Sequence, residues 1–192
     1  SWPGGEPAWR TYVACWAAEK GCGIEGDFVE CGVNRGGMSR AICHYVGFEK
    51  LSRRFWLLDT YHGLDEALIS EEERAQGKNA HRDYYTECYG AVCETFKPSP
   101  NVEVVQGVIP GPLSRVTAEK IAYLSIDMNC VAPEIAAAEH FWDRLSSGAV
   151  IVLDDYGFEL HEPQKRAFDE FARKRGVAVL SMPTGQGLIF KP

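Results

Sequence analysis

The 192-residue sequence lacks the signatures of several protein classes. No apolar run approaches the roughly 18 residues of a spanning helix, and the opening SWPGGEPAWR has no basic start followed by an apolar stretch. The net charge is −7 at pH 7, and the basic residues form no stripe of the kind that binds nucleic acid. We therefore expect a cytoplasmic protein that has neither a membrane nor a nucleic acid as its partner.

Paired cysteines of the C-x-x-C type are also missing, although the chain contains seven cysteines. Seven is an odd number, and several of these residues fall inside expected strands or helices. We interpret them as buried free thiols in a reducing compartment, rather than as disulfides or zinc ligands.

The order of apolar segments predicts an α/β fold. The length and the 45% apolar content suit one core, so we expect a single domain over residues 1–192. Strand-length apolar runs alternate with amphipathic helical stretches, which is typical of a mostly parallel sheet with helices on both faces. The tail VAVLSMPTGQGLIFKP contains two short strands with no room for a helix between them, so the sheet should end in an antiparallel hairpin. The other expected strands are 27–32, 54–59, 102–107, 121–127 and 149–155, and the clearest helices are 133–145 and 162–176.

Two segments fall outside this alternation. Residues 61–85 are polar, poorly periodic and too long for an ordinary connection, so we expect a lid or binding loop there. Residues 1–22 are expected to form an N-terminal helical segment, and a homodimer is one possible role for it. Its aromatic side chains, which we interpret as core or dimer packing, are Trp2, Trp9, Tyr12 and Trp16.

The stretch GDFVECGVNRGGMSR, residues 26–40, predicts a buried strand, a glycine turn and a helix. Such a turn presents backbone N–H groups and a helix N-terminus to a ligand at the carboxyl edge of the sheet. It matches neither G-x-x-x-x-G-K-[ST] nor G-x-G-x-x-G. Glu30 lies two residues before Gly32, where a carboxylate would repel a pyrophosphate and attract an ammonium or sulfonium group. S-adenosylmethionine carries both groups, and its own carboxylate can approach the helix N-terminus near Gly37 to Ser39.

Two later strand ends extend this donor site. Asp59 ends the second strand about 27 residues after Gly32, where an acid can accept both ribose hydroxyls. Gln106 and Gly107 end the third strand, where Gln106 could bond the adenine edge, although a polar residue at a strand end needs no such role. The residues expected around the donor are Glu30, Gly32, Asn34, Arg35, Gly36, Gly37, Ser39, Asp59, Thr60, Gln106, Gly107 and Asp127.

Three carboxylates end the next two strands. Asp127 closes the fourth strand, and Asp154 and Asp155 close the fifth. Neighbouring strands lie ~4.8 Å apart, so the three side chains can converge. Close carboxylates raise one another's pKa unless a cation neutralises them, and all-oxygen ligands select magnesium, manganese or calcium over zinc. The alternative is that Asp154 begins a simple turn and Asp127 caps the segment that follows it.

Four stretches, GDFVECGVNRGG, LLDTYHG, SIDMN and GAVIVLDDYG, resemble the macrocin-type O-methyltransferases. Those metal-dependent enzymes methylate sugar hydroxyls in macrolide and aminocoumarin antibiotics, and the resemblance covers about residues 26–175. It implies a Rossmann-like class I methyltransferase fold, S-adenosylmethionine as donor, and a divalent metal, usually magnesium, held by three aspartates. The acceptor would be a small hydroxylated molecule, either a natural-product sugar or a catechol-like diol.

The sequence departs from that family at one position. The relatives have a second acid two residues after the acid of SID, a proposed general base, whereas this chain has Asn129, which takes up no proton. The base then lies elsewhere, or the metal alone acidifies the hydroxyl. Besides Asp127, the catalytic candidates are His62 and His161, each of which is otherwise a solvated loop residue. Two alternatives stay open: a non-catalytic S-adenosylmethionine-binding module, and an NAD(P)-dependent oxidoreductase.

Overall fold

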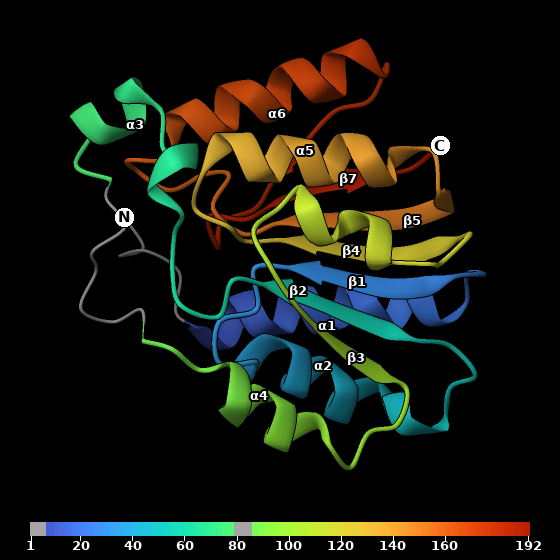
Figure 1. Ribbon diagram of the computed structural model, residues 1–192. Helices are drawn as coiled ribbons and strands as arrows, with labels where there is room; N and C mark the ends of the chain where they lie inside the picture. Colours follow the sequence, from blue (N-terminus) through green and yellow to red (C-terminus); the bar gives the residue numbers. More distant parts are fainter. Residues whose placement is uncertain (1–6, 79–85) are drawn as a thin grey trace.

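Buried apolar runs form the central sheet of the computed structural model, which describes residues 7–78 and 86–192 (Figure 1). The strand order is β3-β2-β1-β4-β5-β7-β6. Strands β1 to β5 pair in parallel, and β7 pairs antiparallel with β5 and β6, so the predicted sheet and hairpin are confirmed. The strands are β1 (Asp27–Cys31), β2 (Phe55–Asp59), β3 (Val102–Gln106), β4 (Ile121–Ile126), β5 (Leu145–Leu153), β6 (Leu180–Ser181) and β7 (Gly187–Phe190).

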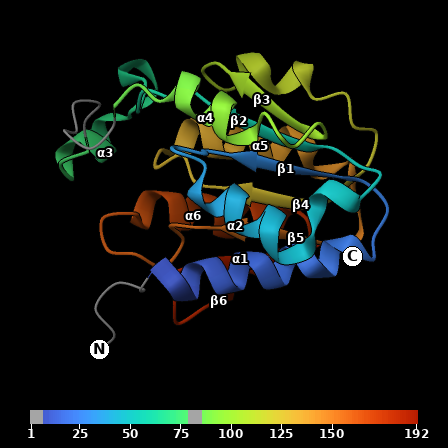
Figure 2. The ribbon, with the colours of Figure 1, turned by 90° about the horizontal axis from the view of Figure 1, so that it is seen from below.

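Helices cover both faces of this sheet, as predicted. Helices α5 and α6 lie on one face, and α1, α2 and α4 lie on the other (Figure 1). Seen from below, α1, α2 and α4 follow one another across the strands (Figure 2). The helices are α1 (Pro7–Cys22), α2 (Gly37–Val46), α3 (Glu71–Ala75), α4 (Tyr89–Phe96), α5 (Val131–Trp142) and α6 (Glu162–Lys174), and the 3-10 turns are η1 (Phe48–Lys50), η2 (Glu66–Leu68) and η3 (Gly111–Arg115).

Each face of the sheet buries its own apolar cluster. Strand β4 lies near the middle of the sheet and is buried along its whole length. Its Leu124 and Ile126 pack in the cluster under α5 and α6, whereas Tyr123 packs in the cluster that faces α1 and α2. Phe168 and Phe171, three residues apart on one face of α6, are both buried against the sheet.

The aromatic residues of α1 were expected to pack in the core or in a dimer, and the structure bears on the first of these. Trp9 and Tyr12 are 49% and 55% exposed, so they are not part of this chain's core, and Trp16 is only partly buried. The buried face of α1 carries small residues instead, including Ala14 and Ala17, because small side chains let the helix approach the sheet closely. Residues 1–6, including Trp2, lie outside the described part of the chain.

The segment expected to be a lid contains η2 and α3, and Tyr61 at its start is buried. Its residues 79–85 lie outside the described ranges. All seven cysteines are free, and Cys15, Cys31, Cys88 and Cys130 are buried. Within residues 7–78 and 86–192, no helix is both long and apolar enough to cross a membrane.

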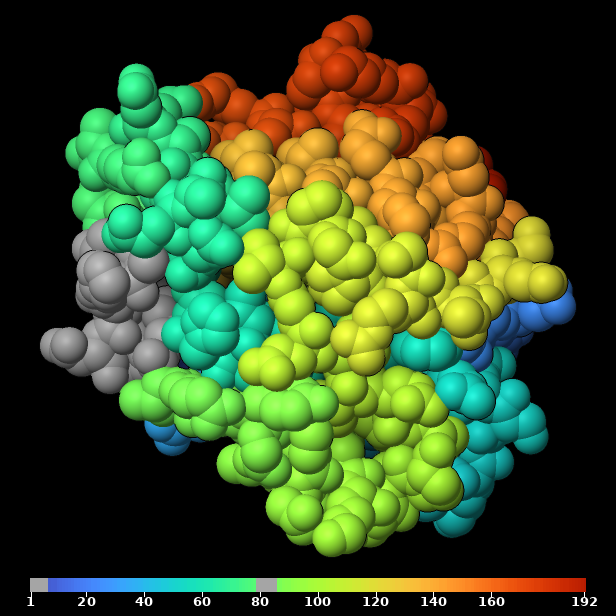
Figure 3. All heavy atoms as spheres, in the orientation of Figure 1, coloured from blue at the N-terminus to red at the C-terminus, as the bar shows by residue number. Residues whose placement is uncertain are grey.

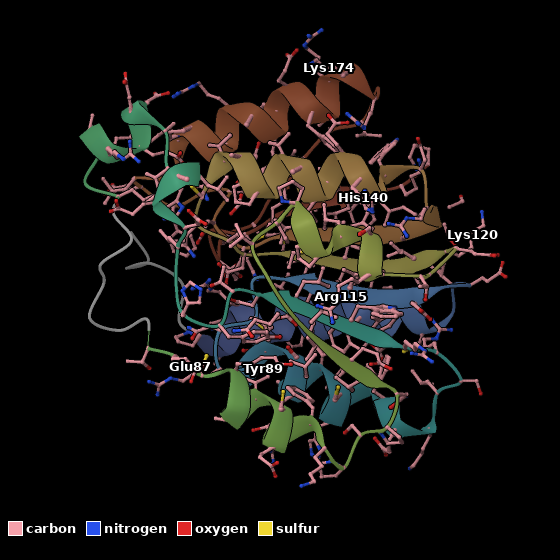
Figure 4. All side chains as sticks on the ribbon, in the orientation of Figure 1. Glu87, Tyr89, Arg115, Lys120, His140 and Lys174 are labelled. Carbon is pink, nitrogen blue, oxygen red and sulfur yellow. The ribbon has the colours of Figure 1, made fainter. Side chains whose placement is uncertain are left out.

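The topology places a crevice at one edge of the sheet. Strands β2 and β3 lie on one side of β1, and β4 and β5 lie on the other, so the chain reverses its direction of winding between β1 and β4. Loops that follow two such strands diverge and leave room for a ligand at their carboxyl ends. Lys120, just before β4, marks the amino edge in Figure 4, and Glu87 lies toward the opposite, carboxyl edge.

Candidate active site

The turn between β1 and α2 requires glycine at two positions. Gly32 has φ +90°, and a Cβ there would lie 1.7 Å from the carbonyl oxygen of Asp127. Gly36 has φ +76°, and a Cβ there would lie 2.8 Å from the ring of Phe96. Gly37 differs, because no described atom lies within 4 Å of the position a Cβ would take. The first residue of α2 therefore faces open space, where a ligand can approach the helix N-terminus.

Asp59, at the end of β2, holds this turn in place. Its Oδ2 accepts hydrogen bonds from the backbone N–H groups of Val33 (2.6 Å) and Asn34 (2.7 Å), and its Oδ1 accepts one from Tyr61 (2.6 Å). The Thr60 hydroxyl has a single proton and lies closer to the Gly63 oxygen (2.6 Å) than to Asp59 Oδ1 (3.2 Å). Asp59 Oδ1 therefore keeps accepting capacity for a ligand hydroxyl, in addition to its role in the turn.

Glu30 lies behind the turn rather than on the wall of the crevice. Its side chain is buried, and its Oε2 accepts a hydrogen bond from Ser39 Oγ at 2.7 Å. Burial, together with the negative charges of Asp127 and Asp59, raises the pKa of Glu30 to about 8 despite the bond from Ser39. At neutral pH most Glu30 side chains are thus protonated in the free protein. A cation bound nearby would favour the ionised form.

We expect Glu30→Gln to stabilise the free protein at pH 8 by about 2 to 4 kcal/mol and to change it little at pH 5. The raised pKa means that the folded protein holds a proton that the unfolded chain, with a pKa near 4.5, has released. The stabilisation by protonated Glu30 is therefore complete at low pH and is lost as the pH rises toward 8. Urea unfolding at both pH values measures the difference. Glu103→Gln on β3, which removes only a half-exposed ion pair with Arg54, is the control. Equal stability of Glu30→Gln and wild type at pH 8 would refute the assignment.

A cavity of about 290 Å³ lies at the carboxyl edge, between the glycine turn, the ends of β2 and β3, and the loop after β4. Several residues expected in the site line it: Gly32, Asn34, Asp59, Thr60, His62, Gly107, Asp127 and Asp155. Lining residues that the sequence did not indicate include Arg10, Tyr61, Cys88, Ile109, Met128 and Cys130.

Arg35 and Gln106, which were expected to contact S-adenosylmethionine, form hydrogen bonds with neighbouring residues. Arg35 is exposed, and its Nη2 donates to Thr86 Oγ1 at 3.0 Å. The Gln106 side-chain amide donates to the Thr60 backbone carbonyl oxygen at 3.2 Å, and the backbone carbonyl oxygen of Gln106 accepts from Arg115, which Figure 4 labels. The adenine contact of Gln106 stays a prediction.

The carboxylates of Asp127, Asp154 and Asp155 meet as the strand ends predicted. One ligand oxygen from each lies within 4.8 Å of the others, because β4 and β5 are neighbouring parallel strands. Burial raises the pKa of Asp127 to about 6, and the charge of Asp59 adds to this. Burial and the charges of Asp127 and Glu134 raise the pKa of Asp155 well above its usual range.

Arg10 of α1 supplies part of the compensating charge. Its Nε donates to Asp154 Oδ1 at 3.2 Å, its Nη2 pairs with Asp154 Oδ2, and Gln186 Nε2 donates to Asp154 Oδ1 at 2.9 Å. By contrast, the buried Asp155 Oδ2 accepts no hydrogen bond from the described residues, and its ion pair with His161 Nδ1, 3.4 Å away, requires a protonated imidazole. Three carboxylates this close together, one of which has a buried oxygen that accepts no hydrogen bond, fit a hard divalent cation.

Residues 11–182 match the model of the macrocin-O-methyltransferase family, TylF. The chain belongs to this family. A curated relative, the 8-demethyl-8-(2,3-dimethoxy-alpha-L-rhamnosyl)-tetracenomycin-C 4'-O-methyltransferase of Streptomyces olivaceus, is 27% identical over an alignment of 146 residues that covers 71% of this chain. The chain spans only 55% of the length of that relative.

Solved structures of methyltransferases share the fold. The O-methyltransferase NovP superposes with a TM-score of 0.80 at 19% identity, over 95% of this chain and 79% of NovP. An O-methyltransferase from Bacillus cereus, solved in complex with SAH, has a TM-score of 0.63 at 14% identity, over 97% of this chain and 82% of that protein. The Rossmann-like class I methyltransferase fold is therefore confirmed.

The two histidines that the sequence offers as proton acceptors lie in different parts of the structure. His62 is exposed on the cavity wall. His161 precedes α6, and its Nδ1 lies 3.4 Å from Asp155 Oδ2, outside the lining of the cavity. Asn129 has φ +57°, and its Nδ2 donates to Asp127 Oδ1 at 3.1 Å. Asn129 therefore orients Asp127 rather than accepting a proton.

Proposed function

We propose that this protein transfers a methyl group from S-adenosylmethionine to a hydroxyl of a small molecule, with a natural-product sugar as the favoured acceptor. Membership of the macrocin-O-methyltransferase family supports the reaction, and the rhamnosyl substrate in the name of the curated relative supports a sugar. SAH, found with a neighbour of the same fold, is the demethylated form of this donor. One observation carries the proposal furthest: Gly32 of the donor turn packs directly on Asp127 of the carboxylate cluster, in one cavity.

The donor would lie along the β1–α2 turn. Backbone N–H groups at the start of α2 face its carboxylate, and Asp59 Oδ1 can accept from a ribose hydroxyl. Glu30 would stabilise the cationic end from behind the turn, because a bound cation shifts its proton equilibrium toward the carboxylate. Gln106 and Gly107 would border the adenine.

Asp127, Asp154 and Asp155 would hold a divalent cation, Mg²⁺ or another hard ion. Such an ion, when bound, lowers the pKa of an acceptor hydroxyl. Asp154 could contribute only if Arg10 gives up at least one of its two contacts. Arg10 also lies over the ring of Phe158, 5.2 Å from its centroid, and could retain that contact.

The protein's own residues would align the reactants and remove the proton. His62, on the cavity wall, is the candidate proton acceptor, and Asn129 would keep Asp127 in place. Transfer of the methyl group neutralises the positive sulfonium and the developing negative charge on the acceptor oxygen, so exclusion of water assists it. Residues 61–65 and Leu68 line the cavity and would exclude water there.

The experiment that tests this function uses S-adenosylmethionine with a labelled methyl group and a panel of rhamnosides and catechols. We expect label on a sugar hydroxyl, loss of transfer with a chelator, and recovery with Mg²⁺. Tight donor binding without transfer to any acceptor would instead indicate a non-catalytic module, which the presence of Asn129 favours. Calorimetric binding of NAD but not of S-adenosylmethionine would indicate an oxidoreductase and overturn the proposal.

A further inference from the structure

A buried polar network connects the segment 66–78 to the loop that carries Asp127. Its members come from three elements: Glu73 and Lys78 lie in or just after α3, Glu134 lies in the first turn of α5, and Gln164 lies in the first turn of α6. Each side chain is buried, and Glu73 and Gln164 are almost completely so. Burying so many polar groups is unfavourable unless each finds a partner.

Glu73 caps two helices at once. Its Oε2 accepts from Ser70 N (3.0 Å) and Ser70 Oγ (2.8 Å), which completes the capping box of α3. Its Oε1 accepts from Val131 N (2.9 Å), the first residue of α5. Among the described residues, Cys130 is the N-cap residue of α5, and its side chain accepts no capping hydrogen bond from the start of that helix. Burial would raise the pKa of Glu73, but the bonds from Ser70 and Val131 outweigh it and hold the pKa below its usual value.

Lys78 ties the end of the same segment to α6 and α5. Its Nζ lies 3.8 Å from Glu73 Oε1 and donates to Gln164 Oε1 at 2.6 Å. Gln164 Nε2 then donates to Glu134 Oε1 at 3.0 Å, and the same oxygen accepts from Met128 N at 3.1 Å. The contacts therefore run without a break from the segment 66–78 to the backbone next to Asp127.

The arrangement of the elements agrees with these contacts. Helix α3 lies beside the ends of α5 and α6 where those helices begin (Figure 1). In the space-filling view, the teal atoms of the segment touch the orange atoms of α5 and α6 (Figure 3). A further contact joins the segment 66–78 to the start of α5, because Cys130 Sγ donates to the Leu68 carbonyl oxygen at 3.2 Å.

We infer that Glu73 is a positioning residue that makes the conformation of the loop 127–130 depend on the segment 66–78. Asp127, Met128, Asn129 and Cys130 all line the cavity. The backbone on either side of Asn129, which has the left-handed φ of +57°, is held by Glu134 at Met128 and by Glu73 at Val131. Loss of the Glu73 carboxylate frees the start of α5 and the segment 66–78 together, and Asp127 loses its fixed position. The catalytic part of this inference rests on the proposed function.

The test compares Glu73→Gln with Glu72→Gln in the whole protein. Glu72 is the neighbouring residue on α3, but it pairs with Arg166 at the exposed surface. An amide at position 73 has a single acceptor oxygen, which cannot accept from the backbone N–H groups of both Ser70 and Val131. We expect amide hydrogen exchange to become about tenfold or more faster in residues 71–75 and in 131–135 together, whereas Glu72→Gln changes neither.

Turnover provides a second, separate readout. In Glu73→Gln we expect kcat to fall about 10- to 100-fold while the dissociation constant of S-adenosylmethionine stays within about twofold, since Asp59, which the network does not contact, still holds the donor turn. Faster exchange confined to 71–75, or donor binding weakened as much as kcat, would overturn the inference. If Glu73→Gln does not fold, Lys78→Met must show the same paired increase in exchange. Absence of methyl transfer in the wild type would refute the proposed function, and the exchange result would still decide this inference.

Discussion

Replacing Asp127 with asparagine should reduce kcat for methyl transfer by about 10²- to 10³-fold, the largest effect on activity that we expect from a single side chain. Asp127 lies where the donor turn, the carboxylate cluster and the cavity meet: its carbonyl oxygen packs on Gly32, and its carboxylate lies with those of Asp154 and Asp155. Asparagine keeps the shape of the side chain and removes its charge. The fall in kcat therefore measures what the negative charge of Asp127 contributes. Single-turnover rates at saturating donor measure it.

The matched control for this prediction is Asp143→Asn, at the exposed C-terminal end of α5. It changes the net charge by the same amount and should leave kcat unaltered. Because Asp127→Asn also removes one of three mutually repelling carboxylates, the variant should unfold at no lower urea concentration than the wild type. A variant with wild-type kcat would mean that the chemistry does not use Asp127.

Gly32→Ala should have the largest effect on stability, a loss of at least about 3 kcal/mol, because it combines a backbone clash with a left-handed φ. A Cβ would lie 1.7 Å from the carbonyl oxygen of Asp127, and φ is +90°. The backbone of β1 or β4 must move to make room. Urea unfolding of the purified variant measures the loss, and failure to obtain folded protein is the extreme form of the same result.

Gly37→Ala is the comparison for Gly32→Ala. No described atom lies within 4 Å of its Cβ position, and Gly37 begins α2, so the unfolding free energy should stay within about 1 kcal/mol of wild type. Its binding of S-adenosylmethionine should nevertheless weaken, since the added methyl group lies where the donor carboxylate would approach. Equal stability of Gly32→Ala and Gly37→Ala would contradict the close packing of the turn on Asp127.

Local patterns predicted the fold and the meeting of the aspartates. The apolar runs of β1 and β4 and the absence of a helix before β7 are visible in the sequence, and parallel strands bring their carboxyl ends to one edge. Asp127 and Asp155 follow neighbouring strands, so their proximity needs only the strand order. This strand order agrees with what the family resemblance implied.

Contacts between distant segments could not be predicted in this way. Arg10 and Asp154 are 144 residues apart, and Val131 and Glu73 are 58 apart, so no local spacing links either pair. The raised pKa of Glu30 could not be predicted from the sequence either. A carboxylate at a strand end is ionised unless the folded protein buries it beside other acids. For a related reason the sequence left core and dimer packing open for the aromatic residues of α1: its alanines, rather than Trp9 and Tyr12, face the sheet.

The most direct test of the account is a crystal of the protein grown with S-adenosylhomocysteine and Mn²⁺, measured for anomalous scattering. The account predicts one Mn²⁺ peak bound by oxygens of Asp127 and Asp155, with the thioether of the ligand beside the turn from Gly32 to Gly37. A ligand bound away from this turn, or a well-ordered ligand at the turn with no Mn²⁺ among the three carboxylates, would contradict it.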